Sequence, residues 1–322
     1  GYYHPLYDLA RHEWDVSGCE DVVEAGRLPR LGWSSEIAGT VHQAAAEASG
    51  IPAGTPVMVG TTDAPAEAVG CGVVAEGDLM AMYGSSGYFI RVGESVATHP
   101  DLWAAPFVFE GTSVLAAGTS TAGTATRWIA EELGIVADHD AATFARLMEL
   151  ASESEPGARG VVALPHFAGE RTPFQDPASR GAFVGLGLDH TRADVARALL
   201  EGVGHSIAEA IATFGRAGAS ISRVTAVGGA TRNEFIIGTV SSITGLDQHV
   251  TDSQGAAFGD AFLAALGVGA VADPSEAVRW SHERTTVSPD PATTDRLRAD
   301  HSDYVALYRA LAPWNQERTP SV

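Results

Sequence analysis

Short apolar runs and helical patterns alternate along this chain of 322 residues from about residue 57 onward. Gly, Pro, Ser and Asp separate the runs, and the longest helical pattern covers about 192–214. Within it Val195, Leu199 and Val203 recur every four residues, as they would on the buried face of a helix. This alternation predicts an α/β fold with a mostly internal sheet.

The other predicted elements follow from shorter patterns of the same kind. We expect helices over about 36–49, 233–244, 255–266 and 293–311, and strands over about 57–60, 79–92, 160–167, 224–229 and 247–251. Gly50 and Pro52 end the first of these helices, and the apolar run VMVG at 57–60 predicts a buried strand. Thr191, with Asp194 three residues later, resembles a capping box for the long helix.

The charged residues exclude several classes of function. The net charge is -20, and all 20 basic residues are arginine. Nucleic-acid binding relies on clustered basic residues, and the sequence has no basic stripe. A chain without lysine cannot form a Walker-type P-loop or a Schiff base, and no turn matches the GxGxxG pattern of dinucleotide-binding folds.

The cysteines and the hydropathy of the chain predict a cytoplasmic protein. Cys19 and Cys71 are the only cysteines and form no CxxC pair, so neither a disulfide framework nor a zinc site is expected. The sequence contains no apolar run of the roughly 18 residues that a membrane span requires. The first residues, GYYHPLYDLARHEWD, lack the pattern of a signal peptide.

Three glycine-rich turns follow predicted strands, at 83–87, 118–124 and 228–233. Such turns let backbone N–H groups approach an anion closely, and a helix that begins behind the turn adds a favourable dipole. A single turn of this kind is weak support for a ligand, because α/β domains commonly contain tight glycine turns that bind nothing.

A few acidic residues are further candidates. Asp63 follows a predicted strand and would project into a cleft at the edge of the sheet, although the local sequence by itself favours an N-cap of the next helix. His166, Glu170, Arg171 and Asp176 crowd one loop, where ion pairs at the surface are the default interpretation. No histidine has partners at metal-ligand spacing, so we predict no metal site built by the protein.

Together these motifs resemble the FGGY family of carbohydrate kinases. Residues 181–201 fit the family's second signature at every constrained position. The family's other motifs have counterparts in the same order, namely GTTDAPAEAVGCG, YGSSG, GTATRW, GERTPFQDPASRG, VGGATRNEF and AAFGDAFLAALGVG. The resemblance spans about residues 6–312 and implies an actin-like, ribonuclease-H-like fold, with a mixed sheet that has helices on both faces.

The resemblance also implies chemistry. Members of this family transfer the γ-phosphate of ATP to a sugar hydroxyl between two related domains, with Mg²⁺ bound mainly through ATP oxygens and water. Asp63 would then be the general base that takes the proton of the attacking hydroxyl.

The nucleotide contacts that the resemblance implies come from the three glycine-rich turns. The terminal phosphates would face the first turn, the second turn and its helix would line the nucleotide cleft, and the third would hold adenine and ribose. In that order the implied residues are Gly84, Ser85 and Ser86; Gly123 and Arg127; and Gly229 and Asn233. Ser85 departs from the threonine that is more usual at its position.

The family's opening hairpin, D-x-G-T-x-x-x-R, has no counterpart in the sequence. We therefore expect residues 1–76 to be a remnant of the N-terminal sugar-binding domain and 77–322 to be the C-terminal nucleotide-binding domain, a fragment that is inactive alone. The expected substrate is a pentulose such as D-xylulose, with ribulose, gluconate, glycerol and erythritol left open. The alternative is a non-catalytic nucleotide-binding remnant or scaffold. The expected partners are a sugar and ATP, without nucleic acid or membrane, and a homodimer is left open.

Overall fold

The computed structural model describes residues 6–94, 97–135, 141–252 and 255–318. The chain forms two compact units, and it passes from one to the other several times. Unit 1 comprises Gly1–Met80, Ile90–Ala116 and Thr251–His282. Unit 2 comprises Ala81–Phe89, Ala117–Val250 and Glu283–Val322.

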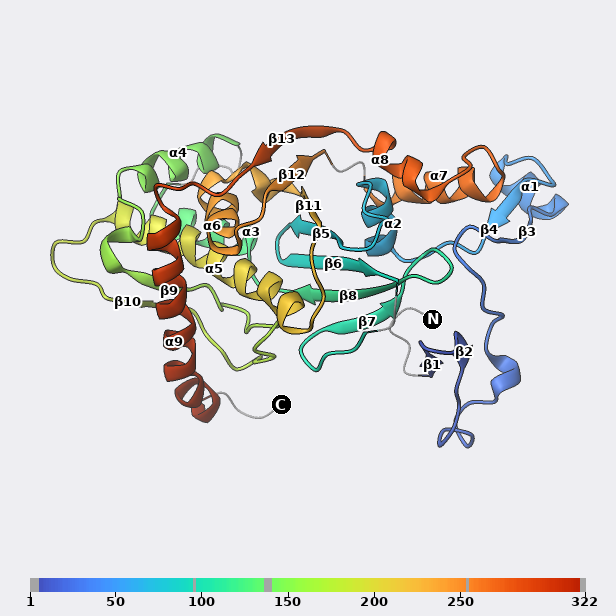
Figure 1. The fold of residues 1–322 in the computed structure, drawn as a ribbon, viewed down its shortest axis with the longest axis horizontal. Helices are drawn as coiled ribbons and strands as arrows, with labels where there is room; N and C mark the ends of the chain where they lie inside the picture. The colour runs from blue at the N-terminus through green and yellow to red at the C-terminus, as the bar shows by residue number, and fades with distance from the viewer. Residues whose placement is uncertain (1–5, 95–96, 136–140, 253–254, 319–322) are drawn as a thin grey trace. The chain divides into compact units, whose positions relative to one another are not determined.

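Seven strands form one mixed sheet, in the order β13-β12-β11-β5-β6-β8-β7 (Figure 1). They span β5 Asp78–Tyr83, β6 Gly87–Gly93, β7 Trp103–Pro106, β8 Ser113–Gly118, β11 Arg223–Val227, β12 Gln248–Thr251 and β13 Glu283–Val287. β11 and β12 are parallel, whereas β7 and β8 are antiparallel. The predicted α/β class with a mixed sheet is therefore confirmed.

Three two-stranded sheets accompany the large one. They pair β1 (Tyr7–Asp8) with β2 (Glu13–Trp14), β3 (Ile37–Thr40) with β4 (Pro56–Met58), and β9 (Val162–Leu164) with β10 (Ala182–Val184). The first two belong to unit 1 and the third to unit 2.

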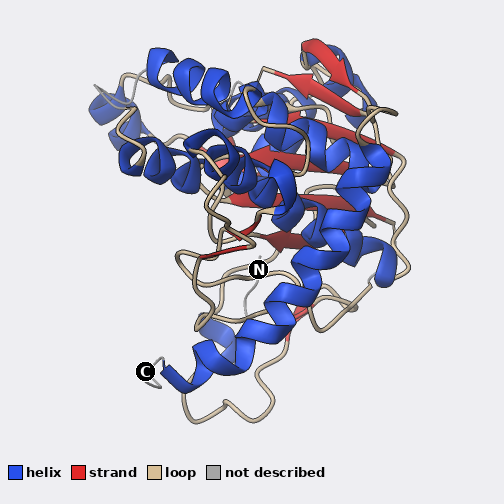
Figure 2. Ribbon diagram, turned by 90° about the vertical axis from the view of Figure 1, so that its left-hand side faces the viewer, coloured by secondary structure: helices blue, strands red, loops and turns tan. Residues whose placement is uncertain are grey.

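The helices of unit 2 are α3 (Gly123–Glu132), α4 (Ala141–Ser152), α5 (Arg192–Arg216), α6 (Glu234–Thr244) and α9 (Thr294–Arg318). The predicted helix at 192–214 is confirmed as α5, and the capping box of Thr191 and Asp194 is formed. Leu199 and Val203 are fully buried, while Val195 is half-buried. In Figure 2, where helices are blue, the long α9 leads toward the C-terminus.

Unit 1 contains α1 (Gln43–Ser49), α2 (Asp63–Gly70), α7 (Ala256–Gly267) and the short α8 (Ala277–Trp280). Helices α2 and α7 lie directly against each other, because Gly259 of α7 has no side chain. A Cβ added there would lie 1.7 Å from the carbonyl oxygen of Ala66.

Two sequence expectations were wrong. The helix expected over 36–49 begins only at Gln43, because Ile37–Thr40 forms β3 and His42 caps α1 through its side chain. The run VMVG at 57–60 forms no buried strand, since Val57 of β4 is 46% exposed. An apolar run does not reveal whether a second layer covers it. Residues 283–287 form β13, a strand that was not predicted because its polar residues gave no apolar signal.

Candidate nucleotide site

A cavity of about 540 Å³ lies in unit 2, where the three glycine-rich turns meet. Its lining consists of Tyr83, Gly84, Ser85, Gly123, Thr126, Arg127, Phe144, Ala145, Met148, Gly229, Ala230, Arg232 and Asn233. Among the predicted nucleotide contacts Gly84, Ser85, Gly123, Arg127, Gly229 and Asn233 therefore share one cavity. Ser86 does not line it, and its carbonyl oxygen accepts the N–H of Gly84 at 3.1 Å.

The first two turns are hydrogen-bonded to each other. The carbonyl oxygen of Gly84 accepts the N–H of Gly123 at 3.0 Å, and that of Ser85 accepts the N–H groups of Ala122 and Thr124 at 2.9 and 3.2 Å. These donors at the start of α3 are therefore used within the protein. The role of Gly123 is close approach instead, because a Cβ there would lie 2.9 Å from the Gly84 oxygen.

The third turn contains two glycines with different roles. Gly228 has φ +99°, and a Cβ there would lie 2.5 Å from the carbonyl oxygen of Tyr83, so the backbone requires glycine. A Cβ on Gly229 would meet nothing within 4 Å. The sequence pattern alone pointed to Gly229 and missed the structural requirement at Gly228.

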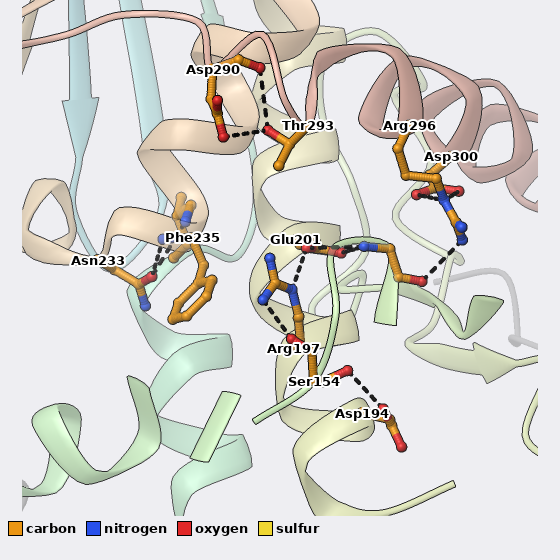
Figure 3. Close-up of polar contacts among 12 residues, drawn as sticks. Ser154, Asp194, Arg197, Glu201, Asn233, Phe235, Asp290, Thr293, Arg296 and Asp300 are labelled. Atoms are coloured by element: carbon orange, nitrogen blue, oxygen red, sulfur yellow. Dashed lines mark hydrogen bonds and ion pairs between the residues drawn. The ribbon is translucent and has the colours of Figure 1, made fainter. Parts of the chain in front are cut away.

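Asn233 is buried and is the N-cap of α6 (Figure 3). Its Oδ1 accepts the N–H groups of Phe235 and Ile236 at 3.1 and 3.3 Å. Its Nδ2 has no hydrogen-bond partner among the described residues. The side chain thus stabilises the helix through its oxygen and leaves two N–H donors for a ligand.

Two arginines give this cavity a positive lining in a chain whose net charge is -20. Arg127 of α3 and Arg232 are both exposed, and neither forms an ion pair with the described part of the chain. A guanidinium group donates planar, paired hydrogen bonds that match phosphate oxygens. Arg232 was not among the predicted residues, although it lies inside the motif VGGATRNEF.

Helix α4 supplies the apolar wall of the cavity through Phe144, Ala145 and Met148. Sequence reasoning missed this helix altogether. Its signal was present, because Phe144, Leu147, Met148 and Ala151 follow the spacing of an amphipathic helix. An apolar wall beside polar turns is the usual composition of a small-molecule site.

Asp63 lies in unit 1 as the first residue of α2, and its side chain is exposed. Thr62, not Asp63, holds the N-cap position, so the alternative that made Asp63 the cap is wrong. Oδ1 of Asp63 accepts the N–H of Ala64 at 2.8 Å, and Oδ2 has no partner among the described residues.

A second cavity, of about 870 Å³, lies within unit 1. Thr61 and Thr62, which directly precede Asp63, are part of its lining. Tyr7, Trp14 and Trp33 add aromatic rings to it.

Three of the four polar residues singled out in the loop between β9 and β10 are buried, contrary to the expectation of surface ion pairs, whereas Arg171 is exposed. His166 is 0%, Glu170 3% and Asp176 4% exposed. Nδ1 and Nε2 of His166 lie 2.8 Å from Ser179 Oγ and Tyr304 Oη. Burial lowers the pKa of His166 to about 4. The sequence could not reveal this, because Tyr304 belongs to α9, far along the chain.

Two further findings concern metals and membranes. In residues 6–94, 97–135, 141–252 and 255–318, no group of three or more His, Cys, Asp or Glu side chains could hold a metal ion. Cys19 and Cys71 are not joined in a disulfide. None of the described helices is long and apolar enough to cross a membrane.

Comparison with known proteins agrees with this geometry. The sequence profile of the FGGY family of carbohydrate kinases, C-terminal domain, matches residues 79–268. A xylulose kinase of Staphylococcus epidermidis is 29% identical over 82% of this chain and 53% of its own length. A ribulokinase of Mycolicibacterium smegmatis is 31% identical over 91% of this chain and 53% of its own length.

A solved structure gives the same result for the fold. The crystal structure of a xylulose kinase from Rhodospirillum rubrum superposes with a TM-score of 0.89 at 28% identity. The match covers 97% of this chain and 63% of that one. The chain thus spans about half the length of the curated relatives it matches.

Proposed function

The chain belongs to the FGGY family of carbohydrate kinases, and we propose that it provides the nucleotide site of an enzyme that phosphorylates a sugar hydroxyl with ATP. The observation that carries this proposal is the cavity of unit 2, where three glycine-rich turns, two unpaired arginines and an apolar wall surround one space. In the proposed domain division, residues 77–322 form the nucleotide-binding domain and 1–76 belong to the sugar-binding domain.

In this proposal the nucleotide spans the cavity from the first turn to the third. Gly84, Ser85 and Ser86 face the terminal phosphates, and Gly123 and Arg127 line the nucleotide path. Gly229 and Asn233 hold adenine and ribose, with the free Nδ2 of Asn233 as the donor. Mg²⁺ is bound mainly by phosphate oxygens and water, as is usual for this ion.

Asp63 is the proposed general base. An exposed carboxylate with a free Oδ2 can accept a proton from a sugar hydroxyl as that oxygen attacks the γ-phosphate. The cavity of unit 1 supports a sugar acceptor near Asp63, because Thr62, next to Asp63 in the chain, is part of its lining. A pentulose such as D-xylulose is the proposed acceptor, and the xylulose kinases among the relatives support this choice.

The nucleotide site is tested by calorimetric titration of the chain with ADP and ATP. Gly229→Val adds a side chain to the cavity without a backbone clash, and Asn233→Ser keeps a helix cap but removes the amide donors. We expect Gly229→Val to weaken binding more than about tenfold, and Asn233→Ser about three- to tenfold, the cost of a lost hydrogen bond.

Gly238→Val is the matched control for Gly229→Val. A Cβ on Gly238 of α6 also meets nothing within 4 Å, but Gly238 does not line the cavity. Its affinity should equal that of the wild type. No nucleotide binding by the wild type, or unchanged binding in both cavity variants, would refute the site.

The general base is tested in the complete protein by Asp63→Asn. The amide keeps the shape of the carboxylate and removes the proton acceptor, so sugar and nucleotide binding should remain while turnover falls by about 10²–10⁴-fold. The measurement is steady-state kinetics together with separate binding titrations for sugar and ATP. Equal turnover in wild type and variant would show that Asp63 is not the base.

A further inference from the structure

Glu170 is a buried carboxylate that does not line the nucleotide cavity. Its Oε1 accepts the backbone N–H groups of Ser120 and Arg171, both at 2.8 Å. Its Oε2 accepts Ser206 Oγ of α5 at 2.7 Å and lies 3.5 Å from His166 Nε2. Among the described residues no arginine forms an ion pair with Glu170, so these donors are what compensates its burial.

Ser120 belongs to the second glycine-rich turn, which ends at Gly123 in the wall of the cavity. A peptide unit is planar, so a hydrogen bond that fixes the N–H of Ser120 also fixes the direction of the preceding carbonyl group. The hydrogen bond from Ser120 to Glu170 therefore fixes the backbone conformation of the turn at this point.

The same loop holds this turn at two other points. Thr172 donates its N–H to the carbonyl oxygen of Gly118 at 3.0 Å, and its Oγ1 accepts the N–H of Gly118 at 3.3 Å. Thr121 Oγ1 donates to the carbonyl oxygen of Pro165. On its other side, the turn donates to the carbonyl groups of Gly84 and Ser85. The turn is thus bonded between the loop and the first phosphate turn.

We propose that Glu170 is a positioning residue for the nucleotide: its Oε1 holds Ser120, and through the 118–123 turn it sets the spacing of Gly123 from Gly84 and Ser85. This inference rests on the proposed nucleotide site. It extends the site to a residue that touches no ligand and explains why a carboxylate is buried here although no arginine among the described residues forms an ion pair with it. Burial raises the pKa of Glu170, the cost that its hydrogen bonds offset.

A second buried glutamate provides the matched control. Glu201 of α5 is 4% exposed, accepts the N–H of Gly157 at 3.1 Å and pairs with Arg197 (Figure 3), and neither of these partners lines the cavity. Loss of either carboxylate should loosen α5. Only loss of Glu170 should move the turn.

The experiment is calorimetric titration of the full chain with ADP for Glu170→Ala, Glu170→Gln, Ser206→Ala and Glu201→Ala, with near-ultraviolet circular dichroism to establish folding. Glu170→Ala should weaken ADP binding by roughly tenfold, because misplacing binding groups is costly even at a distance. Glu170→Gln keeps an oxygen acceptor for Ser120 and should restore affinity to within about threefold of the wild type. Glu201→Ala should bind like the wild type.

Each other outcome overturns the proposal. The first such outcome is that Glu170→Ala binds ADP as tightly as the wild type. The second is that Glu170→Gln weakens ADP binding as much as Glu170→Ala does. The third is that Glu201→Ala weakens ADP binding as much as Glu170→Ala does. If Glu170→Ala does not fold, Ser206→Ala decides, since it frees Oε2 and should weaken binding about two- to threefold, the effect of one hydrogen bond. Wild-type affinity for that variant would refute the inference. Failure of the wild type to bind ADP would instead refute the proposed function itself.

Discussion

Helix α5 carries two buried polar clusters whose charges are compensated in different ways. The arginine cluster consists of Ser154, Asp194, Arg197 and Glu201 (Figure 3). The histidine cluster consists of His166, Glu170, His205, Ser206, His301 and Tyr304. In the first, Arg197 Nε donates to Glu201 Oε1 at 2.7 Å. In the second, hydroxyl, imidazole and backbone groups replace the cation.

The two buried glutamates, Glu170 and Glu201, differ in the backbone groups that they hold. Burial raises the pKa of both Glu170 and Glu201, so the direction of the shift does not distinguish them. Their partners do. Glu201 holds the N–H of Gly157, which does not line the cavity, whereas Glu170 holds the N–H of Ser120 in a turn that reaches it. Perturbed pKa values identify functional sites only together with such geometry.

Glu201→Ala breaks the arginine cluster and should destabilise the protein more than the other substitutions do. Glu201→Ala leaves Arg197, whose side chain is only 13% exposed, without its anionic partner, and it also leaves the N–H of Gly157 unpaired. Removing one partner of a buried ion pair costs about 3–5 kcal/mol of the free energy of unfolding. Urea unfolding at neutral pH measures this loss.

A double variant separates two causes of the lost stability, the unpaired charge and the lost side-chain volume. Arg197→Met with Glu201→Leu removes both charges and keeps most of the side-chain volume, so it should recover most of the stability. A loss below about 1 kcal/mol for Glu201→Ala alone would mean that the pair behaves like an exposed one. The contrast between the two clusters would then disappear.

The arginine cluster was partly predictable from sequence, and the histidine cluster was not. The spacing of Thr191 and Asp194 predicted the start of α5, and the apolar periodicity predicted the buried face of the helix. The alternation of strands and helices gave the fold class. Local patterns of this kind persist because the residues that form them are close in the chain.

The remaining features depend on contacts between distant residues. His166 contacts Tyr304, which is 138 positions away, and Glu170 contacts Ser206 from a different element. The loop therefore looked like a charged surface. The candidate site was predictable through its glycine turns and Asn233, but the capping role of Asn233 and the wall from α4 appear only in three dimensions.

The free energy of unfolding should depend on pH through the histidine cluster. His205 is 4% exposed, its Nδ1 has no hydrogen-bond partner among the described residues, and its ring stacks on His301 and Tyr304 at centroid distances of 5.4 and 5.5 Å. Burial, and then the nearby charge of His301, lowers the pKa of His205 to about 3. The unfolded chain titrates near the ordinary value of about 6.5.

Between these two values the unfolded state binds a proton that the folded state does not. Stability is therefore highest above about pH 6.5 and falls as the pH drops toward 3, by up to about 1.4 kcal/mol for each pH unit from this one group. His205→Phe keeps an aromatic ring against His301 and Tyr304 but cannot bind the proton. Its free energy of unfolding should decline less steeply with acid, by up to one proton in the slope.

The measurement is urea unfolding from pH 7.5 down to the lowest pH at which the chain stays folded, with His282→Phe as the control at an exposed histidine. That control should leave the slope unchanged. Glu209 bonds His301 Nε2 at 3.1 Å, and its own titration contributes equally to both curves, so it cancels in the difference. If the free energy of unfolding falls equally with pH in wild type and His205→Phe, then protonation of His205 costs the folded state no stability. The histidine cluster would then be as well compensated as the arginine cluster.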